Sequence, residues 1–81
     1  MSVKAMADVW EHSEATGNAR LVLLAIADHV NPSNGIAWPS IRRLSEYCKL
    51  DRSNVIRNIN ALIEMGELVK ESGEGRQNTR Y

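Results

Sequence analysis

Residues 44–55 of the chain read Leu44-Ser45-Glu46-Tyr47-Cys48-Lys49-Leu50-Asp51-Arg52-Ser53-Asn54-Val55. Apolar residues then return at helical spacing, at Ile59, Leu62 and Ile63, and Gly66 follows. Asp51 is a favourable N-cap, because its carboxylate can accept a hydrogen bond from the backbone amides of residues 53 or 54. Glycine is common just after the last turn of a helix, where a positive φ is required. The stretch therefore predicts two helices joined by a tight turn, with the second helix over residues 52–65.

The second of these helices has one apolar side and one polar side. Val55 continues the apolar spacing of the later residues, so this side is expected to face the core. The opposite side carries guanidinium, hydroxyl and amide groups, from Arg52, Ser53, Asn54 and Arg57. Such groups suit the phosphates and base edges of a DNA major groove. The structural alternative is that Arg52 and Arg57 pair with neighbouring acids such as Asp51 on the helix surface.

Three helices are predicted before this one, the last of which is the first helix of the pair. The spacing of Val3, Met6, Ala7 and Trp10 predicts a helix over residues 3–11 with these side chains inward. Asn18 is expected to cap a strongly apolar helix over residues 19–30, which would be the centre of the domain. Pro39 fits the first turn of a helix over residues 39–48. The expected inward residues of that helix are Ile41, Leu44 and Ser45, with Tyr47 or Cys48.

After Gly66 the apolar period shortens toward two, which is typical of strands. Residues 68–71 and 76–81 are expected to form the two strands of a hairpin with its turn at 72–75, and residues 36–38 could pair as a third strand. This wing, residues 68–81, would carry Lys70, Arg76 and Arg80. The expected fold is mainly α with a small β-hairpin. It is a winged helix-turn-helix in one domain over residues 1–81, with a three-helix core, a wing and an extra N-terminal helix.

The charge is balanced overall and divided along the chain. Ten Lys and Arg match ten Asp and Glu, which is less basic than many nucleic-acid-binding domains. Residues 1–38 hold two basic and four acidic residues, a net charge of −2, whereas residues 39–63 hold five basic and two acidic residues, a net charge of +3. A local positive patch suffices to meet phosphates. Arg42, Arg43 and Lys49 are therefore further candidates for phosphate contact, and a solvated helix face is the alternative interpretation.

Other classes of protein find little support in the sequence. There is no apolar run of membrane-spanning length and no secretory signal, so we expect a cytoplasmic location. Cys48 is expected in the core, and His12 and His29 lie too far apart, with no ligands near them, to indicate a metal. No phosphate-binding glycine loop or catalytic constellation is present, so we expect neither an enzyme nor a cofactor. Trp10 and Trp38 are expected in the core, although an exposed Trp10 would indicate a protein interface.

Residues 21–81 resemble the bacterial winged helix-turn-helix domain found in phage and plasmid replication proteins and in related transcription regulators. The matching segments are residues 23–29, the turn at Gly35 leading to Trp38-Pro39-Ser40, Leu44-Ser45, residues 51–55 and residues 62–68. The resemblance implies that Arg52, Ser53, Asn54 and Arg57 contact DNA and that the wing contacts the backbone or the minor groove. Ile56 stands where such domains usually carry a polar residue, and Asp51 where Ser or Thr is usual.

Two functions follow from these observations. The first is binding of double-stranded DNA as part of a replication initiator or a transcription regulator, by a single chain or by a homodimer. The alternative is a winged-helix module for protein interaction or dimerisation, which the zero net charge, the acids after Ile63 and the bulky Ile56 beside the expected reading face favour.

Overall fold

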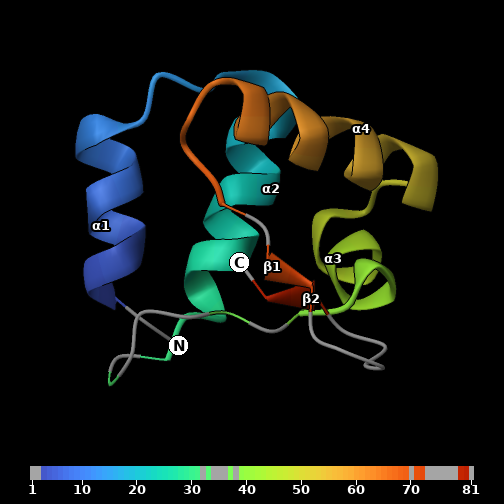
Figure 1. Cartoon of the computed structure of the whole chain (residues 1–81), viewed down its shortest axis with the longest axis horizontal. Coiled ribbons are helices and arrows are strands. Elements are labelled where there is room, and N and C mark those ends of the chain that lie inside the picture. The colour runs from blue at the N-terminus through green and yellow to red at the C-terminus, as the bar shows by residue number, and fades with distance from the viewer. Residues whose placement is uncertain are drawn as a thin grey trace.

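The fold is built from four helices packed around the second. The structure is a computed structural model, and it describes residues 3–31, 33, 37, 39–69, 71–72 and 79–80. The helices are α1 (Val3–His12), α2 (Gly17–Asp28), α3 (Ile41–Cys48) and α4 (Arg52–Glu64). Figure 1 shows α1 beside α2, with α4 across one end of α2 and α3 below α4. Because α2 packs against all three other helices, it is the central helix that its apolar sequence predicts.

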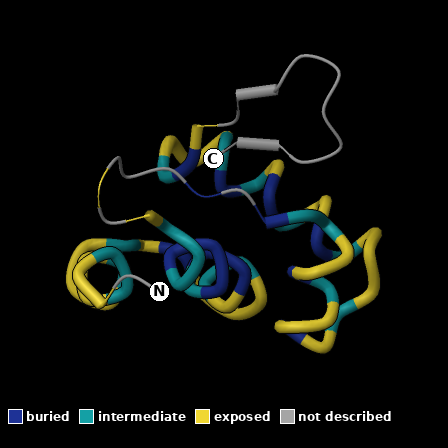
Figure 2. Tube along the Cα trace, turned by 90° about the horizontal axis from the view of Figure 1, so that it is seen from below, coloured by how far each residue is buried: buried dark blue, intermediate teal, exposed yellow. Residues whose placement is uncertain are grey.

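The core lies where α2, α3 and α4 meet. Its largest fully buried side chains are Val22 from α2, Leu44 from α3, and Val55 and Leu62 from α4. Figure 2 shows the buried positions of these helices facing one another, with the exposed positions outside. Cys48 is buried and Tyr47 is half exposed, so Cys48 is the residue that completes the inward side of α3. The orientation of α3 and α4 is therefore fixed by apolar packing.

The inward side of α1 differs from the sequence prediction. Val3 is 74% exposed and Trp10 60% exposed, and Ala7 is also exposed. Val9, which the prediction left out, packs against the core instead. Of the four residues predicted inward, only Met6 is half-buried, and the indole of Trp10 lies at the surface.

The starts of α2 and α3 also differ from the prediction. Thr16 occupies the N-cap position of α2, so Asn18 lies inside the helix and does not cap it. Ser40 caps α3, with its Oγ accepting a hydrogen bond from the Arg43 amide at 3.0 Å. Pro39 therefore precedes the cap and is not in the first turn. The hydroxyl cap decides this boundary because it satisfies an amide that the helix leaves unpaired.

Helix α2 ends two residues earlier than predicted. The helix ends at Asp28, and His29 and Val30 donate to the carbonyls of Ile26 and Ala27 at 3.0 and 3.1 Å. Both hydrogen bonds run from residue i to residue i−3, as in a 3₁₀-helix, and tighten the last turn. Val30 therefore lies beyond the α-helix.

The expected wing is described only in part. Strands β1 (Glu71–Ser72) and β2 (Thr79–Arg80) pair antiparallel, with Glu71 opposite Arg80 and Ser72 opposite Thr79. The first strand thus begins later than predicted: Leu68 is buried against the core, and Leu68 and Val69 are not in a strand. Ser72, predicted in the turn, lies in this strand, and the rest of the predicted turn, residues 73–75, lies outside the described residues. So do Lys70, Arg76 and, from the suggested third strand, Ile36 and Trp38. The wing remains a prediction.

Candidate nucleic-acid interface

A three-residue turn, residues 49–51, joins α3 to α4. Lys49 has φ 58° and ψ 40°, the left-handed conformation in which glycine is more common. This conformation lets the Leu50 amide donate to the Ser45 carbonyl at 3.2 Å, which closes the end of α3. The Ser45 hydroxyl in turn donates to the Leu50 carbonyl. Two hydrogen bonds between Ser45 and Leu50 thus hold the turn against the last turn of α3.

The N-terminal end of α4 is capped as predicted. One carboxylate oxygen of Asp51 accepts a hydrogen bond from the Asn54 amide at 2.7 Å. The helix thus begins at Arg52, as expected, and presents its first turn beside the α3–α4 turn. In Figure 1 this turn lies at the end of α4 farthest from α1.

The other end of α4 is closed by Gly66. The helix ends at Glu64, one residue before the prediction, and Met65 is the C-cap. Gly66 has φ +79°, and the amides of Gly66 and Glu67 donate to the carbonyls of Ile63 and Leu62, both at 3.0 Å. This pair of hydrogen bonds is a Schellman motif, so the predicted role of Gly66 is confirmed.

The outer side of α4 is open to solvent and carries cations. Arg52, Ser53 and Arg57 are exposed and Asn54 is half-buried, while Val55, Ile59 and Leu62 are buried on the inner side. No hydrogen bond or ion pair joins the side chain of Arg52 or Arg57 to any other described residue. The pairing of these arginines with Asp51, which the sequence left open, is absent from this part of the chain. Both guanidinium groups face water.

The four residues predicted on α4 do not share one line along the helix. Successive residues are about 100° apart around the axis, so Ser53 and Arg57 lie one above the other at the centre of the exposed side. Arg52 and Asn54 flank them, about 160° apart from each other. Together they surround the N-terminal turns of α4 on three sides.

Two asparagines of α4 that the sequence left unassigned have different surroundings. The Asn58 side chain donates to the Asn54 carbonyl at 2.8 Å and is half-buried. Asn60 is exposed. The Asn58 amide is therefore used within the helix, and Asn60 is a further polar group on the outer side that sequence reasoning did not select.

The two arginines of α3 have partners of different kinds. Arg42 lies 3.8 Å from Glu46 in a pair whose side chains are 81% and 65% exposed. Such exposed pairs contribute little to stability, so the Arg42 guanidinium is easily released. Lys49 is exposed at the adjoining turn.

Arg43 is held more firmly, by His29 and Tyr47. Its Nε donates to His29 Nε2 at 2.9 Å, and its guanidinium lies 5.1 Å from the centre of the Tyr47 ring. The other nitrogen of His29, Nδ1, lies 2.7 Å from the Ala25 carbonyl. Nδ1 therefore carries the proton and Nε2 accepts from Arg43. The side chains of Arg43, His29 and Tyr47 thus form a cluster where α3 meets the C-terminal end of α2.

A polar cluster that the sequence did not predict lies at the opposite end of α4. The Glu67 carboxylate accepts hydrogen bonds from the Ser13 hydroxyl and, at 3.0 Å, from the Glu14 amide. Arg20 donates to the carbonyls of Trp10, Ser13 and Ala15 at 3.1 to 3.3 Å. The Glu67 contacts fasten the loop between α1 and α2 to the end of α4, and the Arg20 contacts hold this loop and the end of α1 against α2.

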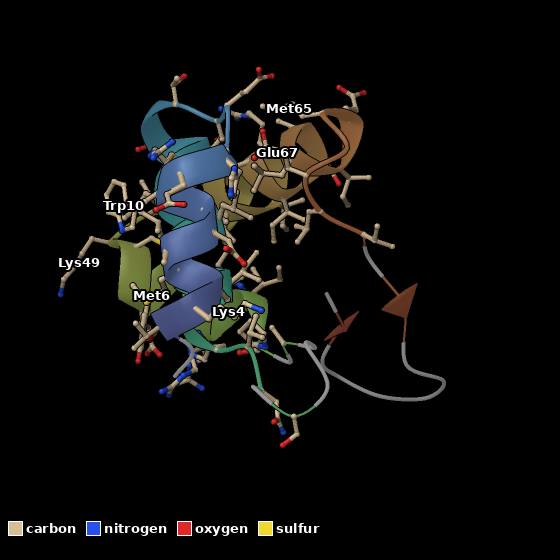
Figure 3. All side chains as sticks on the ribbon, turned by 90° about the vertical axis from the view of Figure 1, so that its left-hand side faces the viewer. Lys4, Met6, Trp10, Lys49, Met65 and Glu67 are labelled. Carbon is tan, nitrogen blue, oxygen red and sulfur yellow. The ribbon has the colours of Figure 1, made fainter. Side chains whose placement is uncertain are left out.

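Trp10 lies outside the core, contrary to the prediction. The Arg20 guanidinium lies 4.9 Å from the centre of its ring and covers one face. Figure 3 shows Trp10 projecting from the side of α1, while Glu67 and Met65 lie near the C-terminal end of that helix. The indole is therefore a surface group with an apolar face.

Neither a cluster of metal ligands nor a membrane-spanning helix occurs among the described residues. No three His, Cys, Asp or Glu side chains gather there as metal ligands. None of the described helices is long and apolar enough to cross a bilayer. Burial raises the pKa of the Cys48 thiol, whose Sγ lies 3.9 Å from the Leu21 carbonyl, so this thiol is a poor nucleophile.

A comparison with known families agrees with this geometry. Residues 16–68 match the family model described as a helix-turn-helix domain, which is more than half of the chain. The chain belongs to this family. The matched region extends from the N-cap of α2 to Leu68. It thus includes α2, α3, the turn at residues 49–51 and α4. Helix α1 precedes the matched region. No curated protein and no solved structure matches the chain.

Proposed function

We propose that this chain binds double-stranded DNA, with α4 in the major groove. The observation that carries the proposal is the open cationic side of α4, held in place by the helix-turn-helix turn. In helix-turn-helix proteins, the N-terminal residues of the second helix contact base edges while the first helix crosses the backbone. The exposed Arg52 and Arg57, whose side chains have no partner among the described residues, occupy that part of α4.

The residues of α4 have distinct roles in this arrangement. Arg57 and Ser53, one turn apart at the centre of the exposed side, enter the groove. A guanidinium favours guanine O6 and N7, and an amide such as that of Asn54 favours adenine N6 and N7. Arg52, at the first position of the helix, is close enough to the backbone side of the groove to bind a phosphate.

The cations of α3 and of the wing bind the backbone in this proposal. Arg42, Arg43 and Lys49 are exposed on α3 and its turn, and His29 and Tyr47 hold Arg43 in one orientation. Lys70, Arg76 and Arg80 are the expected wing contacts to the adjacent backbone. The resemblance to replication and regulatory domains makes an origin or an operator the expected target.

A selection from random duplexes tests the proposal. The full chain is incubated with a pool of duplexes at low salt, and bound sequences are enriched over several rounds. We expect one short motif, and two symmetric copies one helical turn apart would report a homodimer. A pool that remains random after selection, with no retained duplex, would overturn the proposal.

The second candidate is a protein-interaction module. The 60% exposed Trp10 favours it, because α1 lies outside the family match and exposes an aromatic group there. Sedimentation equilibrium of the chain and of Trp10→Ala tests it. A dimer that only the wild-type chain forms would support this role, and a monomer in both would count against self-association.

A further inference from the structure

Ile56 lies on the exposed side of α4 and is not one of the described core residues. Its side chain is 47% exposed, whereas Val55, Ile59 and Leu62 of the same helix are at most 2% exposed. A β-branched residue is not a strong helix former, and an apolar side chain gains nothing from contact with water. Neither packing nor helix propensity accounts for isoleucine at this position.

The neighbours of Ile56 are cations and hydrogen-bonding groups. Around the helix axis it lies about 40° from Arg52 and about 60° from Ser53, and Arg57 follows it in the chain. Residues 52–63 include no acid, and the Asp51 carboxylate is engaged by the Asn54 amide. Ile56 is thus a single apolar group within the surface that carries the proposed DNA contacts.

One apolar group is available to it in the major groove, the C5-methyl group of thymine. We propose that Ile56 contacts a thymine methyl group and so selects thymine over cytosine at one position of the bound site. This inference rests on the proposed DNA binding. An apolar protein surface fits Ile56 less well, because docking there would remove water from the neighbouring guanidinium groups without pairing them.

Single replacement of thymine by deoxyuridine tests the contact. The replacement removes the methyl group and leaves the hydrogen-bonding groups of the base unchanged. Each thymine of the duplex enriched from the random pool is replaced in turn, and affinity is measured by fluorescence anisotropy at fixed salt. At one position, we expect the wild-type chain to bind about fourfold more weakly, the usual effect of burying one such carbon group.

The variant Ile56→Ala completes the comparison. It should bind the thymine duplex more weakly than the wild-type chain, and it should bind the thymine and deoxyuridine duplexes equally at that position. Val3→Ala is the matched control, since Val3 is also β-branched, is 74% exposed and lies on α1. This control should discriminate as the wild-type chain does. Because Ile56 is exposed, circular dichroism should show the native helix content in Ile56→Ala.

Two results would overturn the thymine contact while DNA binding stands. One is a wild-type chain that tolerates deoxyuridine at every position. The other is discrimination that persists undiminished in Ile56→Ala. A pool from which no duplex is enriched overturns the proposed function itself, and the thymine contact with it.

Discussion

The Glu67 carboxylate joins two parts of the chain that are far apart in sequence. Its hydrogen bonds to Ser13 and to the Glu14 amide span more than fifty residues and fix the α1–α2 loop against the end of α4. Arg20 holds the same loop against α2 by hydrogen bonds to three carbonyls. At the scale of single residues, this junction and the cap of α4 are the polar contacts that position the exposed face.

Replacement of Glu67 should therefore destabilise the fold. Glu67→Ala removes both acceptors and leaves the Glu14 amide unpaired, so the free energy of unfolding should fall by about 1–3 kcal/mol in urea denaturation. Glu64→Ala is the control, since the Glu64 side chain is exposed and has no hydrogen-bond partner in the described part of the chain. It should change stability by less than about 0.5 kcal/mol. Equal losses in the two variants would contradict this role of Glu67.

Cys48 should make stability depend on pH in alkaline solution. Burial raises the pKa of its thiol above the ordinary value of 9.0, so the folded chain keeps the proton that the unfolded chain loses. The contribution of Cys48 is thus complete below about pH 9, and the free energy of unfolding falls as the pH rises above that value.

Urea denaturation under reducing conditions, between pH 7 and pH 10, measures this effect. Cys48→Ala should be less stable at neutral pH because a buried side chain is truncated, and it should lack the thiol's share of the alkaline decline. Parallel stability curves for the two chains across this range would refute the assignment.

At the scale of elements, α4 was largely predictable because its signals are local. The Asp51 cap, the spacing of Val55, Ile59 and Leu62, and the Gly66 terminus all lie within or beside the helix, and each has the predicted role. The inward side of α1 was not predictable in the same way. Apolar residues occur on more than one side of this helix, and the packing of Val9 against the core decides which side faces inward.

The cap of α4 gives a prediction with two variants. Asp51→Ala removes the acceptor for the Asn54 amide and should cost about 1 kcal/mol of unfolding free energy. Asp51→Asn keeps an acceptor oxygen and should be nearly as stable as the wild-type chain, because asparagine caps helices about as well as aspartate.

The same pair separates stability from binding. Asp51→Asn also removes a negative charge beside Arg52, so it should bind DNA more tightly than the wild-type chain at low salt. Urea denaturation and fluorescence anisotropy provide the two measurements. Equal stability of the alanine and asparagine variants would show that the cap is unimportant.

At the scale of the whole molecule, charge and packing divide the chain into two sides. The N-terminal part is acidic and includes α1, whereas the residues from α3 to α4 carry the cations and the open face. A net charge of zero thus conceals a molecule with one basic side. The sequence predicts this separation because charge can be counted along the chain. It does not predict the Glu67 junction or the exposed Trp10, since both depend on contacts between segments distant in sequence.

The salt dependence of DNA binding tests the central claim most directly. The affinity of the chain for the selected duplex should fall steeply with added salt, since each neutralised phosphate adds about −0.9 to the slope of log affinity against log salt. Arg57→Ala should bind more weakly at every salt concentration because it loses a base contact, and it should remain folded.

Lys4→Ala removes an exposed cation from α1, on the opposite side, and should match the wild-type chain. An Arg57→Ala chain that binds as tightly as the wild-type chain would contradict the assignment of α4 as the DNA-binding helix.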